Sequence, residues 1–504
     1  MLPIDTYLYT AAASRAIDAS AIEKLGVPGY TLMQRAAQAA FTLLLQSFPE
    51  VSRISVVCGK GNNAGDAYLL AGLARQMGIQ VQLIAALPPA ELQGDAALAH
   101  AHAMAIGVDL AAPDEALTGE VIVDGLLGSG LQGPPREAIA TWIEQINASA
   151  RPVLSLDLPS GVETDTGAAP GAVVQATLTL SFITRKIGLY TGAGLSLAGQ
   201  RHVDDLGVPA HCYAPSDVVS VRWQAKDLPM LDLNTYKHRQ GHVVIAGGDL
   251  SMPGAVSMAA QAALRVGAGM VTVLTHAQHT AALVSRTPEV MVVGFNPDDD
   301  DAGESAAQLL QKADCVVLGP GLGRSQWSEA LYRKVEISQR PTVLDADGLF
   351  WLAAHTSWHG GPLTITPHVA EAARLLGVET DAVQANRLSS ARQLSKQYSC
   401  HGVLKGAGSV VFADQAADLG ICMHGNPGMA TAGMGDVLSG ILGALVGQYA
   451  RSSLLEPDLA LRLGVSLHSA AADSAALQMG QRSLLATDVI AALPKLLQQS
   501  TGQL

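Results

Sequence analysis

The feature that most constrains the fold of this chain is a recurring unit, in which a short run of β-branched residues ends in a loop rich in glycine, asparagine or aspartate. The run at 53–58 reads RISVVC and ends in GKGNNAGDA, and we expect the next helix over 68–77. The run at 242–248, HVVIAGG, begins a second series of such units. Strands that alternate with helices at this spacing form parallel sheets, with ligands bound where the strands end. The pattern therefore predicts an α/β protein.

An irregular stretch separates the two series. Residues 210–234 contain prolines and isolated charges but no sustained apolar period, which indicates a domain boundary. A chain of 504 residues is also too long for one ordinary core. We therefore predict two different three-layer α/β domains in series, over 1–215 and 225–504. Aromatic residues make up only 4% of the chain, so both cores must be built from Ala, Val, Leu and Ile.

Charge and cysteine content exclude some classes of protein. The formal net charge of −13 argues against general nucleic-acid binding, which needs clustered cations. The five cysteines are scattered and form no CxxC pair, so neither a disulfide framework nor a zinc site is expected. The longest apolar run, 437–450, is too short to cross a bilayer, and the N-terminal segment has acidic residues where a leader would be apolar. We expect a cytoplasmic protein with no nucleic-acid or membrane partner.

Three strand ends in the first half carry oxygen-rich side chains. The loop at 59–66 lets backbone N–H groups approach a phosphate, although alone it is better explained as an ordinary turn with an Asx cap. The segments 123–131 (VDGLLGSGL) and 155–161 (SLDLPSG) each add an aspartate at the end of another strand. Parallel strands direct these ends into one crevice. That crevice would offer oxygen ligands for a cation, with Asp157 as the carboxylate for proton transfer.

These segments, with RAID at 15–18 and LMQ at 32–34, resemble the NAD(P)H-hydrate epimerase family over roughly residues 10–210. The resemblance implies a Rossmann-like domain that interconverts the R and S forms of hydrated NAD(P)H at C6 of the nicotinamide ring. It also implies a potassium ion held by Asn63, Asp124 and Ser160. The implied substrate contacts are Asn62, Asn63, Ala64, Gly65, Asp66, Gly128, Ser129, Gly130, Leu131, Gln132, Gly133, Pro134 and Asp157.

The loop departs from the family pattern at two positions. The family reads NNGGDG, whereas Ala64 and Ala67 stand at two of the glycine positions in this chain. An alanine that must adopt a positive φ costs about 1 kcal/mol. If either position needs that conformation, substrate binding by the first half is weakened.

One stretch in the second half carries the strongest chemical signal. It reads NPGMATAGMGDVLSG at 426–440, a glycine-rich turn that opens into a helix with Asp436 in its first turn. Backbone N–H groups at such a helix start stabilise a phosphoryl oxyanion, and the aspartate accepts a proton from the attacking hydroxyl. The alternative is a capped and tightly packed glycine-rich helix. The density of glycine around a single aspartate favours catalysis.

Four other loops in this half also follow strands. LKGAGS at 404–409 is suited to hold the phosphates and adenosine of a nucleotide, and GPGLG at 319–323 is another glycine-rich turn. LDADGL at 344–349 ends its strand in carboxylates, and TPH at 366–368 is followed by Glu371. A histidine such as His368 could serve as a structural cap, but its place beside these loops favours a ligand contact.

In this order the motifs resemble the ribokinase-like superfamily, and specifically its NAD(P)H-hydrate dehydratase branch, from about residue 230 onward. The resemblance implies an enzyme that uses ADP to convert the S form into NAD(P)H, AMP and phosphate. The C6 hydroxyl would be phosphorylated after Asp436 deprotonates it, with Mg²⁺ neutralising the phosphates. The implied nucleotide contacts are Lys405, Gly406, Ala407, Gly408, Ser409 and Gly435, and the implied substrate contacts are Ala255, Gly321, His368 and Asp436.

The whole chain is therefore expected to be a bifunctional enzyme that repairs hydrated NADH and NADPH. The family resemblance also implies a homo-oligomer. Two alternatives remain open on the residues alone. One is a ribokinase-like small-molecule kinase fused to a nucleotide-binding module, which would release a phosphorylated product. The other is a nucleotide-sensing or scaffolding protein whose first half has lost catalysis.

Overall fold

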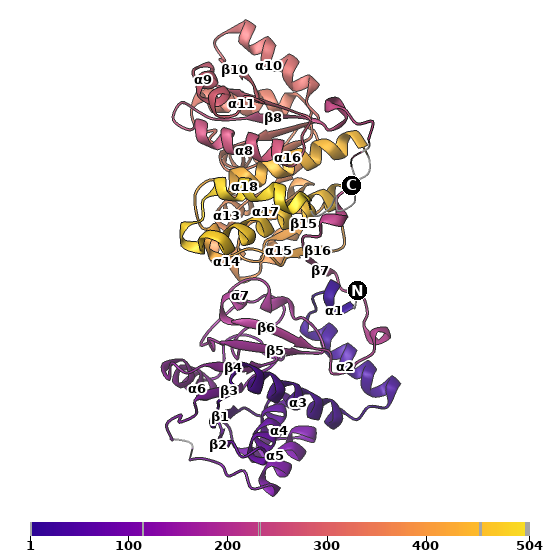
Figure 1. Ribbon diagram of the computed structural model, residues 1–504, viewed down its shortest axis with the longest axis vertical. Coiled ribbons are helices and arrows are strands. Elements are labelled where there is room, and N and C mark those ends of the chain that lie inside the picture. The colour runs from indigo at the N-terminus through magenta and orange to yellow at the C-terminus, as the bar shows by residue number, and fades with distance from the viewer. Residues whose placement is uncertain (1–2, 113–114, 230, 232, 453–455, 499–504) are drawn as a thin grey trace. The chain divides into compact units, whose positions relative to one another are not determined.

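The computed structural model describes residues 3–112, 115–229, 231, 233–452 and 456–498. The chain divides into two compact units between Val219 and Ser220, and each unit has its own sheet (Figure 1). The predicted fold class, two α/β domains in series, is confirmed. No helix in the described part of the chain is long and apolar enough to cross a membrane.

The first unit is built on a six-stranded parallel sheet with the order β2-β1-β3-β4-β5-β6. The strands are β1 (Arg53–Cys58), β2 (Gln80–Ala85), β3 (Val121–Gly125), β4 (Val153–Leu156), β5 (Leu178–Phe182) and β6 (Gln200–Asp204). The helices are α1 (Pro3–Thr6), α2 (Ala11–Leu25), α3 (Gly29–Ser47), α4 (Asn62–Gln76), α5 (Gly94–Ala105), α6 (Glu137–Ala148) and α7 (Gly194–Leu197), with short 3₁₀ turns η1 (Pro89–Glu91), η2 (Ile187–Leu189) and η3 (Ala210–Cys212).

Apolar cores cover both faces of this sheet. Successive side chains of a strand point to opposite faces, so Val56 of β1 packs with α3, α4 and α5 while Val57 packs with α6. Helix α6 buries Ile139, Ile143 and Ile146 at the spacing of one helical face. The result is the predicted three-layer arrangement, with α3 to α5 on one side of the sheet and α6 on the other (Figure 1).

Helix α4 begins earlier than the sequence predicted. Its first residue is Asn62, with Gly61 as the N-cap, so the expected loop ends at Gly61 and Asp66 lies within the helix. Ala64 and Ala67 are fully buried helical residues, and neither adopts a positive φ. The expected cost of alanine at these positions therefore does not arise.

The second unit is built on a ten-stranded sheet with the order β10-β9-β8-β11-β12-β13-β14-β15-β16-β7. The strands that pair in parallel are β8 (His242–Ala246), β9 (Met270–Thr275), β10 (Met291–Gly294), β11 (Cys315–Leu318), β12 (Thr342–Leu344), β13 (Leu363–Ile365) and β14 (His401–Leu404). An antiparallel extension follows in β15 (Val410–Phe412) and β16 (Leu419–Cys422). The edge strand β7 (Val218–Val221) lies in the stretch that the sequence predicted to be irregular.

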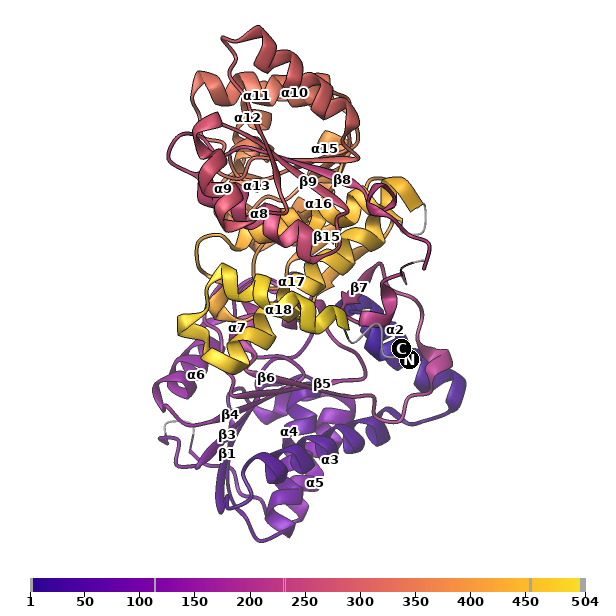
Figure 2. The same cartoon turned by 45° about the horizontal axis from the view of Figure 1, so that its top comes forward.

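Helices cover both faces of this larger sheet. Its α-helices are α8 (Pro253–Arg265), α9 (Thr280–Arg286), α10 (Asp300–Lys312), α11 (Gln326–Ile337), α12 (Asp347–His355), α13 (Val369–Leu376), α14 (Thr380–Ala385), α15 (Arg387–Tyr398), α16 (Met434–Ser452), α17 (Pro457–Met479) and α18 (Ala486–Gln498). Its 3₁₀ turns are η4 (Ala225–Asp227), η5 (Lys237–Arg239), η6 (Ala277–His279), η7 (Pro427–Met429) and η8 (Gln481–Ser483). Helices α8, α16, α17 and α18 share one core, with α17 and α18 side by side (Figure 2).

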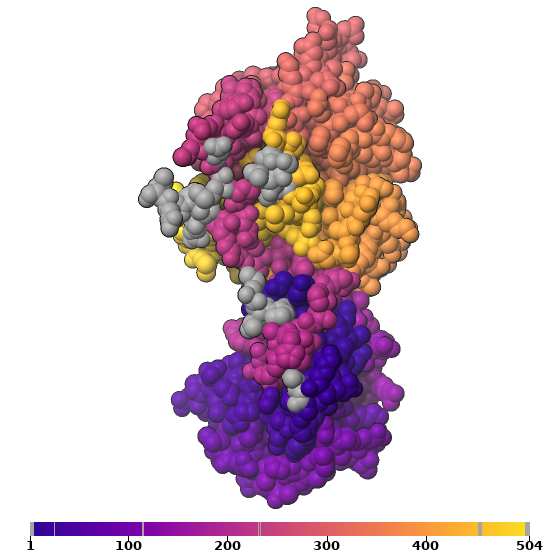
Figure 3. Space-filling model, turned by 90° about the vertical axis from the view of Figure 1, so that its right-hand side faces the viewer, coloured from indigo at the N-terminus to yellow at the C-terminus, as the bar shows by residue number. Residues whose placement is uncertain are grey.

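The glycines of α16 let it pack closely against α8 and the sheet. A Cβ on Gly440 would stand 2.1 Å from the Ala259 carbonyl oxygen, and one on Gly443 would stand 2.4 Å from Val317. Figure 3 shows the yellow and gold C-terminal helices between the magenta-to-red and orange segments of the same unit. Gly440, which belongs to the stretch that favoured catalysis in the sequence, and Gly443 therefore serve packing.

The two separate cores lead to a prediction about fragments. A cut between residues 217 and 218 keeps β7 with the ten-stranded sheet, so fragments 1–217 and 218–504 should each fold alone. Circular dichroism on heating should give one cooperative transition for each fragment. If either fragment is insoluble or melts without cooperativity, the two units depend on each other for folding.

Candidate active sites

A cavity of about 670 Å³ lies at the C-terminal ends of β1, β3, β4 and β5 in the first unit. The structure brings together there most of the residues predicted to contact substrate. Ala64, Gly65 and Gly133 do not line the cavity, because Ala64 is in the core and Gly65 packs against Met33. The predicted residues that do line it are Asn62, Asn63, Asp66, Gly128, Ser129, Gly130, Leu131, Gln132, Pro134 and Asp157.

Asp124 organises the floor beneath this cavity. It ends β3, is fully buried, and accepts four hydrogen bonds. The Ser160 hydroxyl and the Ser155 hydroxyl donate at 2.6 and 2.9 Å, and the backbone N–H groups of Ser160 and Leu126 donate at 2.9 and 3.2 Å. Burial raises the pKa of Asp124 and these hydrogen bonds oppose the rise. Asp124 therefore ties together the loops after β3 and β4.

Asn63 lies next to this network, and its two polar atoms differ. Its Nδ2 donates to the Leu127 carbonyl at 2.9 Å, whereas its Oδ1 is buried and accepts no hydrogen bond from any described residue. Ser160 Oγ also lies near Leu127, accepting from its N–H at 2.8 Å. A buried amide oxygen without a donor suits a cation ligand, because the desolvated oxygen is otherwise uncompensated.

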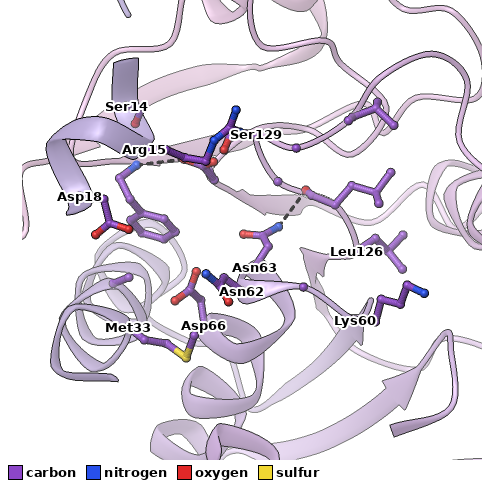
Figure 4. Close-up of a pocket in the computed structure, with 18 of the residues that line it drawn as sticks. Ser14, Arg15, Asp18, Met33, Lys60, Asn62, Asn63, Asp66, Leu126 and Ser129 are labelled. Atoms are coloured by element: carbon purple, nitrogen blue, oxygen red, sulfur yellow. Dashed lines mark hydrogen bonds between the residues drawn. The ribbon is translucent and has the colours of Figure 1, made fainter. Parts of the chain in front are cut away.

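Carboxyl groups and one lysine gather on the other side of the cavity. Asp18 of α2 and Asp66 of α4 both point into it (Figure 4), and Asp157 follows β4. The Nζ of Lys186 lies 2.5 Å from Asp157 Oδ1. Burial raises the pKa of Asp66 well above its ordinary value, the charges of Asp157 and Asp18 raise it further, and Lys186 opposes this. Asp66 thus lies beside an ion-paired Asp157 in surroundings that disfavour its charged form.

A second cluster lies where β12, β13 and β14 end in the second unit. Its centre is Asp345, which is 1% exposed and accepts at 2.6 Å from the Ser439 hydroxyl and at 2.8 Å from the Thr366 hydroxyl. The Nζ of Lys405 lies 2.5 Å from Asp345 Oδ1 and 3.9 Å from Glu371 Oε2. Burial alone would raise the pKa of Asp345, but Lys405 and these hydrogen bonds hold it below the ordinary value.

Asp436 lies beside this cluster in the first turn of α16, as predicted. Burial raises its pKa to about 7, and the charge of Asp345 adds to the rise while Lys405 opposes it. The carboxylate is therefore poised to gain or lose a proton near neutral pH, as a general base requires. A Cβ on Gly435 would stand 3.3 Å from Asp345 Oδ2 and 3.5 Å from Lys405 Nζ, so this position lies directly against the ion pair.

The predicted nucleotide loop, Lys405 to Ser409, rests on a buried arginine. Gly406 and Gly408 have φ values of +142° and +64°, which explains the glycines. Arg387 is 1% exposed and donates to the carbonyls of Leu404 and Lys405 at 3.1 and 3.3 Å. Burial lowers the pKa of this guanidinium to about 10, so it stays charged beneath the loop.

The remaining predicted substrate residues differ in how they are placed. Ala255 and Gly321 are neighbours, since a Cβ on Gly321 would stand 3.1 Å from the Ala255 Cβ. His368 is the N-cap of α13, and its Nδ1 accepts from the N–H groups of Ala370 and Glu371 at 3.2 Å each. His368 therefore caps α13, and its half-exposed side chain stays a predicted ligand contact. Within the described residues, no group of three or more His, Cys, Asp or Glu side chains is placed to hold a metal ion.

Comparison with known proteins accounts for both units. The NAD(P)H-hydrate dehydratase family model matches residues 243–495, and the model for YjeF-related protein N-termini matches residues 29–188. The bifunctional NAD(P)H-hydrate repair enzyme of Coxiella burnetii is 42% identical over 490 residues, covering 96% of this chain and 98% of that protein. The enzyme of the same name from Escherichia coli is 41% identical over 483 residues, covering 94% and 91%. The chain belongs to the bifunctional NAD(P)H-hydrate repair enzymes.

A solved structure shares the fold of the second unit. The ribokinase-like superfamily protein of Enterococcus faecalis is 26% identical, covers 57% of this chain and 98% of its own, and superposes with a TM-score of 0.50. The expected assignment of the second half to the ribokinase-like superfamily agrees with this likeness.

Sequence reasoning missed several residues of these sites. Lys186, Asp18 and Arg15 line the first cavity, and Arg387 supports the loop of the second site. Arg15 and Asp18 belong to the RAID segment that carried the family resemblance, whereas no local pattern marks Lys186, which follows Arg185, or Arg387. Asp345 was noted only as a strand-end carboxylate, yet it holds Lys405.

The ion pair between Asp345 and Lys405 predicts a stability defect. Asp345→Asn leaves a buried ammonium largely unpaired, which costs about 3–5 kcal/mol when one partner of a buried pair is removed. Urea unfolding of the full chain should show the transition of the second unit at lower urea. The double variant Asp345→Asn/Lys405→Met should recover part of the loss. An unchanged midpoint for Asp345→Asn would contradict the role assigned to the pair.

Proposed function

We propose that the first unit interconverts the R and S forms of hydrated NADH and NADPH at C6, and that the second unit converts the S form to the reduced dinucleotide. The second step consumes ADP and releases AMP and phosphate. One observation carries the proposal: relatives named bifunctional NAD(P)H-hydrate repair enzymes align with nearly the whole chain at up to 42% identity. The two clusters of titratable residues supply the chemistry that each step needs.

In the second unit, Asp436 is the proposed base. It takes the proton of the C6 hydroxyl, whose oxygen then attacks the β-phosphorus of ADP while AMP leaves. Loss of phosphate from C6 and of a proton from C5 restores the C5–C6 double bond. The N–H groups around Gly433 to Gly435 stabilise the phosphoryl group at the start of α16.

The nucleotide in this unit is proposed to bind Lys405, Gly406, Ala407, Gly408, Ser409 and Gly435, with substrate at Ala255, Gly321 and His368. Mg²⁺ would neutralise the phosphates of ADP. Magnesium binds through one or two carboxylates and substrate phosphates instead of an all-protein cage. That preference fits a described region without a dedicated cluster of metal ligands.

In the first unit, Asp157 is the proposed proton carrier. Removal of the C6 hydroxyl proton lets the C6–N1 bond break, with its electron pair passing to N1, which takes up a proton. The aldehyde formed at C6 turns about the C5–C6 bond, and the reverse transfers close the ring on the other face. Asp66, whose pKa is raised by burial and by the charge of Asp157, is the proposed donor of the proton to N1.

The potassium site is proposed at Asn63, Asp124 and Ser160. The buried Oδ1 of Asn63, which accepts no hydrogen bond from any described residue, supports it. The cation would offset the negative charge of the cavity, where an anionic dinucleotide must bind. A cytoplasmic location also belongs to this proposal, since all five cysteines are unpaired and buried.

One experiment tests the whole proposal. A mixture of R and S hydrates is supplied with ADP and Mg²⁺, and NADH formation is followed by absorbance. Complete conversion requires both units, whereas a stop at the S fraction means that the first unit does not epimerise. Accumulation of a phosphorylated product without NADH would instead favour a small-molecule kinase.

Removal of the proposed base should stop only the second reaction. Asp436→Asn should lower the dehydratase rate by about 10²–10⁴-fold, because a general base contributes that much. The base must be ionised, so the rate of the unaltered enzyme should fall as pH drops below about 7, the raised pKa of Asp436. Interconversion of R and S forms without ADP is the control and should not change. A near-normal dehydratase rate in the variant would refute the role.

Potassium should stabilise the first unit. A ligand that binds the folded state at 100 times its Kd stabilises it by about 2.7 kcal/mol. The Tm of the full chain should therefore be higher in potassium than in choline at equal ionic strength. Asn63→Ala should lose this difference, while Asn62→Ala, at the exposed neighbouring asparagine, should keep it. An equal potassium effect in both variants would show that Asn63 is not a ligand.

A further inference from the structure

Lys186 is almost completely buried and still lines the cavity of the first unit. It is 2% exposed and lies four residues beyond the end of β5. Its Nζ donates to the Phe182 carbonyl at 2.5 Å and lies 2.5 Å from Asp157 Oδ1. Moving an ammonium out of water costs several kcal/mol unless it is paired. The side chain is therefore held in place by these two oxygens.

The backbone before Lys186 is bent to allow these contacts. Ile183 adopts φ +65°, which is a genuine outlier for a β-branched residue. Its N–H donates to the Asp204 carbonyl, and the N–H of Thr184 donates to the Phe182 carbonyl, both at 2.7 Å. The turn carries the chain back across the end of β5, so that the Lys186 side chain reaches Asp157. Such strain persists only where the surrounding structure enforces it.

The two oxygens of Asp157 have different surroundings. Oδ1 faces Lys186 and also accepts from the Phe182 N–H at 3.4 Å. Oδ2 faces the loop after β3, because a Cβ on Gly128 would stand 3.6 Å from it. Gly128 lines the cavity. One oxygen is thus occupied by the lysine and the other is presented to the substrate.

Other charged groups face this pair from the packed helices. Asp66 comes from α4, while Asp18 and Arg15 come from α2. Asp95 of α5 acts on Asp18, whose pKa is raised by burial and by Asp95 and is lowered by Lys186. Lys186 therefore acts on several carboxyl groups at once: it contacts Asp157 and lowers the raised pKa values of Asp66 and Asp18.

We propose that Lys186 is a positioning residue for the epimerisation assigned to the first unit. It fixes Asp157 through Oδ1, so that Oδ2 is held toward the cavity as the proton acceptor for the C6 hydroxyl. This inference rests on the proposed function of the first unit. Without the ammonium, Asp157 would lose the partner that holds Oδ1 and would face the carboxyl groups of Asp66 and Asp18 with no buried cation between them.

The test replaces the Lys186 side chain with a neutral one of similar size. Lys186→Gln in the full chain should lower kcat for R-to-S conversion by about 10²-fold or more at pH 7, because the base is protonated. The KM should change little, since the Lys186 ammonium is held by Asp157 and by the Phe182 carbonyl. The rate of the variant should recover as pH rises and Asp157 ionises again, which a purely structural role would not produce. Lys186→Arg should restore part of the rate at pH 7.

The controls separate this inference from the function on which it rests. Lys24→Gln, at an exposed lysine of α2, should leave epimerisation unchanged, and the ADP-dependent step should be normal in every variant.

If the unaltered chain does not interconvert R and S forms, the proposed function fails. If it does, and Lys186→Gln keeps the same kcat and pH profile, the role of Lys186 is overturned. A fall in kcat that is equal at all pH values would overturn it as well. If Lys186→Gln does not fold, Lys186→Arg provides the test by itself. A shift of the acidic limb in its pH profile of kcat, relative to the unaltered chain, supports the role. An unshifted acidic limb overturns it.

Discussion

A lysine buried against a strand-end aspartate is the interaction on which both active sites depend. In the first unit Lys186 Nζ lies 2.5 Å from Asp157, and in the second Lys405 Nζ lies 2.5 Å from Asp345. Each pair lies at the C-terminal edge of a parallel sheet, where neighbouring strands deliver their last residues to one place. A buried pair of this kind stabilises the fold little by comparison with apolar packing, but it fixes the positions of its two charged groups. The chemistry of both sites depends on that fixed charge.

The two pairs are used differently. In the first unit the proposed proton carrier, Asp157, is itself a member of the pair. In the second unit Asp345 stays ionised, and its charge helps raise the pKa of the neighbouring Asp436 to about 7. One pair therefore holds the proposed proton carrier in place, and the other pair acts on the pKa of a separate proposed base. The difference follows from burial, because Asp345 is enclosed by Ser439 and Thr366 while Asp157 keeps one oxygen at a cavity.

The sequence predicted the alternation of strands and helices, and it placed Asp124, Asp157 and Asp436 at the ends of secondary-structure elements. These predictions depend on local patterns, which residue spacing records. Lys186 and Arg387 were missed because their roles depend on contacts made across the fold, with Asp157 and with the Leu404 carbonyl. The early start of α4 was missed because glycine, asparagine and aspartate are common both in turns and in first helical turns. The packing role of Gly440 and Gly443 in α16 was missed for a related reason, since close helix packing and phosphate binding call for the same residue.

The coupling of the two proposed reactions explains why the first site needs little specificity. Epimerisation consumes no co-substrate, so it can only bring R and S forms to their equilibrium ratio. The second step is coupled to ADP cleavage and removes the S form. By mass action, the R form is then converted into the S form. The first site must then accept both configurations of the C6 hydroxyl. A cavity in which Asp157 is paired with Lys186 and stands beside Asp66, whose pKa is raised, meets this demand. One carboxyl group can take a proton and the other can give one, and their roles exchange when the reaction runs in reverse.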